Sequence, residues 1–529
     1  FLQACLDAGT ATLLYKISRR VFAAVREGKS GADPTWTPGR AGEIIGVAAA
    51  AGWATFVPAQ AYSVILMPTA WLVFVFWFLV WQCLNAPAPL HLGRCLLWGL
   101  LIGVTATGVA TIFFIIPLVV TAIVKRTRRL SALAGVAMLL VGIFAGTAPC
   151  WMHNYFIARE PVFLSAHSGI NFWIGNNPVA NGYPRIPPGL RAGQSAMLQD
   201  SIDVAEAAAG HPLKRADVSD YWSEKARNYI RSHFGEWLQL TTTKFRNFWN
   251  AFQYDDLSII TSLREEGVIL PGPRLGLIAA LALPGMFFAA VRFPRSRWIA
   301  VAVLLHMMSL LGVFVTERYR LAAVPGLLLF AGFTLWKLSE FASKGRVANA
   351  FGMGAAIALS TLFVSLPQRD PALWALDAYN SGWQALESGN LPLAQRKLEL
   401  ARAYVPDNAE INLALGNLAL AQSDSVQAKQ FYASALQIDP DHKSALSNLG
   451  VLMLEERAPQ VAASLFRRAL KSTPADAKTH FLLARAEFES GNLRPALEEV
   501  EMAVRISPAQ PEFQALYNEI VKASGSTMP

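Results

Sequence analysis

Long apolar segments alternate with short polar breaks over residues 1–366. The segments carry few charged residues, and prolines, glycines or basic clusters separate them. Several approach the ~20 residues that a helix needs to cross the hydrocarbon core of a bilayer. The pattern predicts an all-α fold built on a polytopic membrane helix bundle. The segments lie at residues 1–15, 42–57, 61–84, 95–108, 109–124, 130–151, 273–291, 298–315, 321–337 and 347–366.

Basic residues gather at the ends of three apolar segments, and they predict the orientation of the bundle. The clusters are Lys16-Ile-Ser-Arg-Arg, Lys125-Arg-Thr-Arg-Arg and Arg292-Phe-Pro-Arg-Ser-Arg. Membrane proteins concentrate Lys and Arg in their cytoplasmic loops. If all three clusters are cytoplasmic, strict alternation of the segments places the long polar stretch 152–272 and everything after Leu366 on the extracytoplasmic side.

The long polar stretch contains a turn-rich sequence soon after it leaves the apolar segment 130–151. Asn171-Phe-Trp-Ile-Gly-Asn-Asn-Pro sets two aromatic residues beside Gly, Asn and Pro. This composition suits a rigid loop at the membrane surface with its side-chain amides exposed to an amphiphilic ligand. It suits a well-packed connector with no further role equally well.

Two amphipathic helices are predicted further along the same stretch. Apolar residues recur at helical spacing from Tyr221 to Ile230 and again from Trp237 to Trp249. In the second helix, Lys244 and Arg246 fall on the polar side. Such a helix can lie in the membrane interface and attract anionic head groups, or it can pack on its own loop domain.

Residues 368–529 lose the apolar segments and show a pattern with a period of 34 residues. Proline recurs late in each unit, and small residues recur at three positions inside it. The positions are Pro406, Pro440, Pro474 and Pro508; Ala394, Ala428, Ala462 and Ala496; Ala401, Ala435, Ala469 and Ala503; and Gly382, Gly416, Gly450 and Ala484.

This pattern resembles the tetratricopeptide repeat, in which small residues let two helices nest and a proline ends the second helix. The resemblance predicts an α-solenoid with a final capping helix and a concave groove that binds a protein or peptide. The repeats are expected at about 375–408, 409–442, 443–476 and 477–510.

Composition agrees with a membrane protein and excludes several other classes. Of 529 residues, 53% are hydrophobic and only 16% charged, against about 25% charged in soluble domains. The net charge of +9 resides largely at segment ends, so nucleic acid is not a predicted partner. The four cysteines lie in or beside apolar segments and show no C-x-x-C spacing, which argues against a disulfide framework and a zinc site. No phosphate-binding loop or dinucleotide fingerprint is present.

Within residues 1–367, four stretches resemble bacterial multi-span glycosyltransferases of the GT-C fold, the group of protein O-mannosyltransferases and the aminoarabinose transferase of lipid A. Residues 2–22 are similar to the family's second membrane helix and its basic exit. Residues 149–155 are similar to its membrane exit, where His153 replaces an arginine. Residues 171–182 resemble its external N-x-x-x-G-N-N-P segment, and residues 318–325 its R-Y-x-x-P motif.

The resemblance implies an integral protein of the bacterial inner membrane that moves a sugar from a polyprenyl-phosphate donor to an extracytoplasmic acceptor, with no divalent metal implied. The family uses an acidic residue in its first external loop, which we expect just upstream of Phe1. Asp7, near the outer end of the first segment, is the candidate within the chain, since acids inside a membrane are costly and often functional. Snorkelling to the interface is the alternative for this carboxylate.

Donor binding is predicted for residues expected at the outer side of the membrane. Arginine suits bidentate contact with phosphate at interface depth. A plain interfacial anchor pair, with Glu317 as its partner, is the alternative for the arginines. The predicted donor-binding residues are Arg318, Tyr319, Arg320, Asn176, Asn177 and His153.

Two other functions fit the same layout of membrane helices, external loop and repeats. One is a polymerase or ligase of surface polysaccharides, for which an essential external arginine and histidine without a catalytic carboxylate would be the sign. The other is a catalytically inactive scaffold that anchors the repeats and organises an envelope complex. Paired acids in an external loop upstream of Phe1 would favour the glycosyltransferase.

Overall fold

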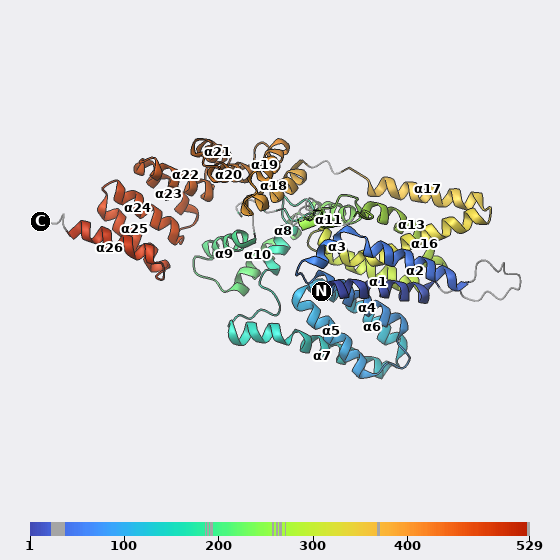
Figure 1. Cartoon of the computed structure of the whole chain (residues 1–529). Helices are drawn as coiled ribbons and strands as arrows, with labels where there is room; N and C mark the ends of the chain where they lie inside the picture. The colour runs from blue at the N-terminus through green and yellow to red at the C-terminus, as the bar shows by residue number, and fades with distance from the viewer. Residues whose placement is uncertain are drawn as a thin grey trace. The chain divides into compact units, whose positions relative to one another are not determined.

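The helices of the chain form two compact units (Figure 1). The structure is a computed structural model that describes residues 1–22, 38–185, 187, 190, 194–255, 259–260, 263, 267–269, 271–367 and 371–525. Every regular element in these ranges is a helix, which confirms the all-α prediction for the part described. One unit comprises Phe1–Pro187 and Leu213–Gln368; the other comprises Pro188–Pro212 and Arg369–Pro529. Residues 188–212 of the long polar stretch therefore group with the C-terminal helices.

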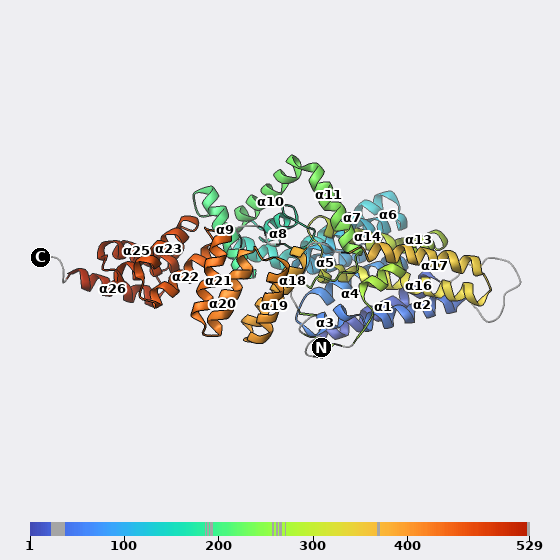
Figure 2. The ribbon, with the colours of Figure 1, turned by 90° about the horizontal axis from the view of Figure 1, so that it is seen from above.

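The first unit packs its apolar helices around one large core. Helices α1, α2 and α16 lie side by side within it (Figures 1 and 2). The apolar elements are α1 (Leu2–Val21), α2 (Pro38–Ala54), α3 (Val57–Val64), α4 (Thr69–Asn85), α5 (Leu92–Gly108), η1 (Ala110–Ile115), α6 (Ile116–Arg126), α7 (Arg129–Met152), α13 (Leu275–Arg292), α14 (Ser296–Leu311), η3 (Leu321–Ala323), α16 (Val324–Ser343) and α17 (Val347–Val364).

Four helices among the described residues are long and apolar enough to cross a bilayer. They are α7 with its continuation to Ile157, α13, the helix from Glu317 to Ser343, and α17. Helices α2 and α3 pass the same test together but are bent by 54° at the break between them. Helices α4, α5 and α14 are apolar but shorter, at 17, 17 and 16 residues.

The apolar segment predicted at 61–84 is two helices in the structure. Helix α3 ends at Val64 and α4 begins at Thr69, with Pro68 as the N-cap of α4. Because Pro68 has no amide hydrogen, α3 cannot continue through it with a normal hydrogen-bond ladder. The prediction of one continuous segment was therefore wrong at this proline.

Helices α5 and α7 approach each other at a row of glycines. A Cβ atom on Gly99 would come within 2.1 Å of the Leu139 carbonyl oxygen, and one on Gly142 within 2.2 Å of the Leu96 carbonyl oxygen. No side chain fits at such distances, so the two backbones are in direct contact. Small residues at this spacing permit such close packing of apolar helices.

In the ranges described, the polar part of the first unit contributes the three helices α8, α10 and α11 and a π-helical turn. Helix α10 carries the apolar face predicted around Trp222, and α11 carries the one predicted around Phe248. The π-turn extends α7 with three exposed apolar side chains, Tyr155, Phe156 and Ile157. The elements are η2 (His153–Ile157), α8 (Ser168–Gly175), α10 (Arg215–Ser232) and α11 (Phe234–Trp249).

The second unit consists of four antiparallel helix pairs, a final helix, and α9 (Gln194–Ala209) from the polar stretch. Figure 2 shows the pairs following one another along the C-terminal part of the chain. Each recurrent proline lies two residues beyond the end of the second helix of a pair. The helices are α18 (Pro371–Glu387), α19 (Leu391–Tyr404), α20 (Ala409–Ala421), α21 (Ser425–Ile438), α22 (Lys443–Glu455), α23 (Pro459–Ser472), α24 (Ala477–Glu489), α25 (Leu493–Ile506) and α26 (Pro511–Gly525).

Packing inside each pair explains why the period holds small residues. A Cβ atom on Gly416 would lie 2.4 Å from the ring of Tyr432, and one on Gly450 would lie 2.6 Å from the ring of Phe466. The first helix of the pair thus leaves room for a large side chain on the second. The eight recurrent alanines of the two alanine registers have no exposed surface at all.

Candidate functional site

Arg320 lies inside the protein, where it joins two parts of the chain, the turn at Glu317–Arg320 and residues 247–252. It is the last residue of the short helix α15 (Glu317–Arg320), and it is 1% exposed. Nη1 donates to the carbonyl oxygens of Asn247 (3.2 Å) and Asn250 (2.8 Å), and Nη2 donates to that of Phe252 (2.8 Å). Nη2 also forms an ion pair with the buried Glu317 carboxylate. Both terminal nitrogens of the guanidinium thus bind oxygens of the protein itself. This argues against the prediction that Arg320 binds the polyprenyl-phosphate sugar donor, and it favours the alternative in which Glu317 is its partner.

The two residues before Arg320 are less buried. The Arg318 guanidinium lies 4.8 Å from the ring centroid of Tyr319, a cation–π distance. The Tyr319 carbonyl accepts a hydrogen bond from His306 Nε2 at 2.7 Å, and the Tyr319 amide donates to the Thr316 hydroxyl at 3.2 Å. This capping contact begins α15 and so fixes the turn that carries the arginines.

Asn176 is the centre of a second buried polar cluster. Its Nδ2 donates to the carbonyls of Phe172 (2.9 Å) and Gly312 (3.0 Å). Its Oδ1 accepts from Trp237 Nε1 and from Lys244 Nζ, both at 3.0 Å. The Asn176 side chain therefore ties α8 to α11 and to the C-terminal end of α14. The prediction that this amide is exposed to a ligand was wrong, because its residue is only 1% exposed.

Lys244 was predicted on the polar side of an interfacial helix, and the structure places it in the interior with no exposed surface. Nζ donates to Asn176 Oδ1 and, at 3.2 Å, to the Leu311 carbonyl near the end of α14. Both acceptors are uncharged, although carbonyls at a helix C-terminus attract a cation. Burial lowers the pKa of Lys244 to about 7.

The remaining predicted residues are not gathered around one ligand. Asn177 donates to the carbonyls of Trp173 and Ile174 and accepts from the Val179 amide, which closes the turn after α8. His153 is exposed and begins η2. Asp7 is half-buried on α1, and its Oδ2 has no hydrogen-bond partner within the described part of the chain. The structure does bring Asn176 and Arg320 to the same helix, α11, through contacts with Lys244 and Asn247.

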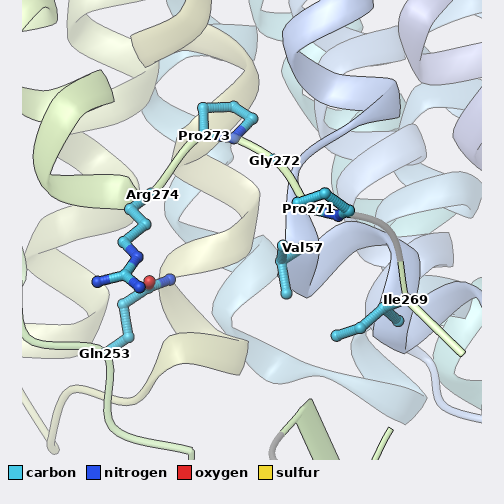
Figure 3. A pocket seen from close by; sticks show the side chains of 7 residues that line it. All are labelled: Val57, Gln253, Ile269, Pro271, Gly272, Pro273 and Arg274. Atoms are coloured by element: carbon cyan, nitrogen blue, oxygen red, sulfur yellow. The ribbon is translucent and has the colours of Figure 1, made fainter. Parts of the chain in front are cut away.

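A pocket of about 340 Å³ lies beside the break between α2 and α3. Figure 3 shows Arg274 and Gln253 on one side of it, with Val57 and Ile269 on the other. The chain 271–273 forms its rim and packs so closely that a Cβ atom on Gly272 would be 1.6 Å from the Thr55 carbonyl oxygen. Gln253 Nε2 donates to Glu317 Oε1 at 2.8 Å, so the pocket is one hydrogen bond away from the buried Arg320–Glu317 pair.

Sequence reasoning missed both Lys244 as a buried group and Arg274 as a pocket residue. Arg274 is exposed at the N-cap of α13. It follows Pro-Gly-Pro and directly precedes an apolar segment, which is a pattern that marks a cation at a membrane surface. For Lys244 the local pattern gives no signal, because its partners lie 68 and 67 residues away in the sequence.

The second unit contains a larger cavity, of about 930 Å³. It lies against the first helices of the third and fourth pairs, α22 and α24, and against the turn before α24. Lys443, Lys471 and Lys478 supply positive charge, and Lys443 Nζ pairs with Asp476 Oδ2 at 3.2 Å. Helix α9 and the residues that follow it also line the cavity. The lining mixes polar side chains with apolar ones, among them Val451 and Leu482.

Comparison with known proteins agrees with the architecture of the C-terminal part. Residues 379–443 and 453–520 each match a family model described as tetratricopeptide repeat. The C-terminal part of the chain therefore carries tetratricopeptide repeats, as the 34-residue period predicted. No curated protein matches the chain.

Several solved structures are similar to part of the chain. MamA 41-end from Desulfovibrio magneticus RS-1 is 18% identical, with 29% of this chain and 97% of that chain covered and a TM-score of 0.26. YrrB, described as a TPR protein with an unusual peptide-binding site, is 17% identical, with 34% and 87% covered and a TM-score of 0.25. The pilF protein of Pseudomonas aeruginosa is 16% identical, with 36% and 83% covered and a TM-score of 0.28.

Proposed function

We propose that the chain is a membrane-anchored scaffold whose repeats bind a peptide segment of a protein partner on the extracytoplasmic side of a bacterial inner membrane. The observation that carries this proposal is the 930 Å³ cavity on the repeat helices α22 and α24. Stacked helix pairs present an extended concave surface, and such surfaces suit a peptide better than a small reacting molecule.

The shape of the cavity wall supports a peptide ligand. Lys443, Ser447 and Val451 line it at a spacing of four residues, so they form one stripe along α22. The Ser447 hydroxyl is buried and has no hydrogen-bond partner among the described residues. Lysine, hydroxyl and apolar groups in one row are the mixture that a peptide with alternating side chains requires.

Membrane anchoring is supported by apolar side chains that the protein itself leaves uncovered. On α17, Val347 is 76% exposed, Phe351 80% and Leu359 69%. Monomeric soluble proteins rarely expose such continuous apolar surface. The test of the topology is a phosphatase reporter fused after Leu366, which is active only outside the cytoplasm. Activity confined to a cytoplasmic reporter at this position would overturn the proposed orientation.

Peptide binding can be tested with the full chain in lipid nanodiscs. Peptides selected from a displayed random library are then measured against two variants. Ser447→Arg fills the cavity and is expected to weaken binding at least about tenfold, since one lost polar contact and a steric clash exceed 1.4 kcal/mol. Arg494→Glu, on the well-exposed face of α25, should leave binding unchanged. Equal effects of the two variants would refute binding in this groove.

A second candidate function is transfer of a sugar from a polyprenyl-phosphate donor, as the GT-C resemblance of residues 1–367 implies. The observation that favours it is the 340 Å³ pocket at the α2–α3 break, with the exposed Arg274 beside it at the predicted outer end of α13. A guanidinium at interface depth attracts a lipid-linked phosphate more strongly than one in bulk water.

This candidate replaces Arg320 by Arg274 as the residue that binds phosphate. Arg274→Ala is expected to weaken binding of a polyprenyl phosphate by a factor of about 10 or more, the cost of a lost charged hydrogen bond. The matched control is Arg346→Ala, an exposed arginine between α16 and α17 on the predicted cytoplasmic side. Equal losses, or none, in the two variants would remove the support for this pocket as a donor site.

A further inference from the structure

Helix α9 belongs to the long polar stretch in sequence but to the repeats in structure. Residues 188–212 and 369–529 form one compact unit. Ser201 and Ala205, one turn apart on α9, are only 3% and 0% exposed. A 16-residue helix is marginal on its own in water, and it cannot bury its own residues on one face. Other groups of the protein therefore cover this face, which lies opposite the acidic residues Asp203 and Glu206 on the helix.

The residues of α9 that line the 930 Å³ cavity form a single stripe. Gln199, Asp203, Glu206 and Gly210 follow one another at intervals of four, three and four residues, which is the repeat of one helix face. The stripe of α22 described above lines the same cavity. Helix α9 of this chain thus borders the groove in which we propose that a partner peptide binds.

The two walls of the groove carry opposite charge. On the repeat side, three lysines, Lys443, Lys471 and Lys478, outnumber the single acid Asp476. On the α9 side, Asp203 and Glu206 face the cavity, and residues 194–212 contain no lysine or arginine. Complementary potentials of this kind select a partner and its orientation more than they add to affinity.

We propose that α9 is an intramolecular ligand of the repeat groove, and that an acidic helical segment of a partner binds there by displacing it. The inference rests on the proposed peptide-binding function and adds the chemistry of the partner and the means of regulation. Because α9 is tethered, its effective concentration at the groove is of the order of millimolar. A partner must therefore compete with α9, and exposure of the groove depends on release of this helix.

The first test measures hydrogen exchange of residues 194–209 in the full chain. In one variant, Asp203→Lys and Glu206→Lys reverse the charge of α9; in another, Lys471→Glu and Lys478→Glu reverse the charge of the groove. Each should raise the exchange rate of α9 at least about threefold, since exposed charge pairs contribute up to about 1 kcal/mol each. The combination of both reversals should restore protection.

The matched control reverses two exposed acids of α10, Asp220→Lys with Glu224→Lys, and should leave exchange of α9 unchanged. Protection of α22 and α24 is followed in the same spectra, so that loss of the repeat fold is distinguished from release of α9. Equal exchange of residues 194–209 in all variants would overturn the inference. Failure of the combined reversal to restore protection, with α22 and α24 still protected, would overturn it too.

The second test uses a labelled synthetic peptide of residues 194–212 as the probe. It should bind the full chain carrying Asp203→Lys and Glu206→Lys at least about tenfold more tightly than the unaltered chain, because the tethered competitor has been weakened. Equal binding to both overturns the intramolecular role of α9. If library peptides nevertheless bind Ser447→Arg more weakly than the unaltered chain, the proposed peptide-binding function stands although the role of α9 is refuted. Failure of the inference and failure of the proposed function are therefore distinguishable.

Discussion

Replacing Arg320 by methionine tests whether this arginine holds the protein together or binds a ligand. The substitution keeps an apolar stem of similar length but removes every donor from the buried guanidinium. Glu317, itself 1% exposed, then keeps Gln253 Nε2 as its one side-chain donor among the described residues. The carbonyls of Asn250 and Phe252 lose their 2.8 Å contacts. Breaking a buried ion pair from one side costs about 3–5 kcal/mol, because a charge is left in the interior without its partner.

Thermal unfolding of the full chain at fixed detergent concentration is the assay. For domains of about 150–250 residues, each kcal/mol of lost stability lowers the unfolding temperature by roughly 2 °C or more. Arg320→Met should therefore lower the unfolding temperature of the first unit by about 6–10 °C. The matched control is Arg318→Met, two residues earlier and only half-buried. We expect less than about 2 °C for the control, since a partly exposed charge contributes at most about 1 kcal/mol.

A double substitution separates the stranded charge from the lost hydrogen bonds. In Glu317→Gln with Arg320→Met, no buried carboxylate remains, so part of the lost stability should return. If Arg320→Met instead unfolds at the same temperature as Arg318→Met and loses affinity for polyprenyl phosphate, the guanidinium faces a ligand. That result would refute the structural role and reinstate the motif 318–325 as a donor site.

The repeats could be predicted from the sequence because their geometry is local. Each pair of helices is fixed by contacts within about 34 residues, so the small residue at Gly416 and the aromatic ring of Tyr432 that it admits lie in the same unit. The N-caps add a further local signal: Asn408 Oδ1 accepts from the Ile411 amide at 3.0 Å, and Asp424 Oδ1 from the Gln427 amide at 2.9 Å.

The buried polar clusters could not be predicted, because chain segments far apart in sequence create them. Helical periodicity placed Lys244 on a polar face, and polar faces are usually exposed. In the structure that face meets the amide of Asn176 from α8 and the carbonyl of Leu311 from α14. The burial of Arg320 could not be predicted for the same reason. The motif 318–325 can be seen in the sequence, but the carbonyl groups that bind the Arg320 guanidinium belong to residues 247–252.

Three further predictions test individual groups. Gly142→Val should prevent normal packing of α5 on α7, because its Cβ would lie 2.2 Å from a backbone oxygen, and the variant should accumulate poorly in membranes or unfold at a clearly lower temperature. In the repeats, both ring nitrogens of His480 face oxygen acceptors, and its hydrogen bond with Glu499 raises its pKa. The charged His480 imidazolium contributes its full stability below the ordinary histidine pKa of ~6.5, and this stability is lost as pH rises through the raised pKa of His480. Hydrogen exchange of α24 should therefore quicken from pH 6 to 9 more in the unaltered chain than in His480→Gln. For Lys244 the pKa shift has the opposite direction: burial lowers its pKa in the folded protein to about 7, against ~10.4 in the unfolded chain. Between these two values the unfolded state binds more protons than the folded state. The stability of the folded protein therefore rises with pH across this window. The unfolding temperature of the unaltered chain should therefore rise from pH 7 to 9.5 relative to that of Lys244→Met, and a constant difference between the two would show that the buried amine keeps its proton at the ordinary pKa.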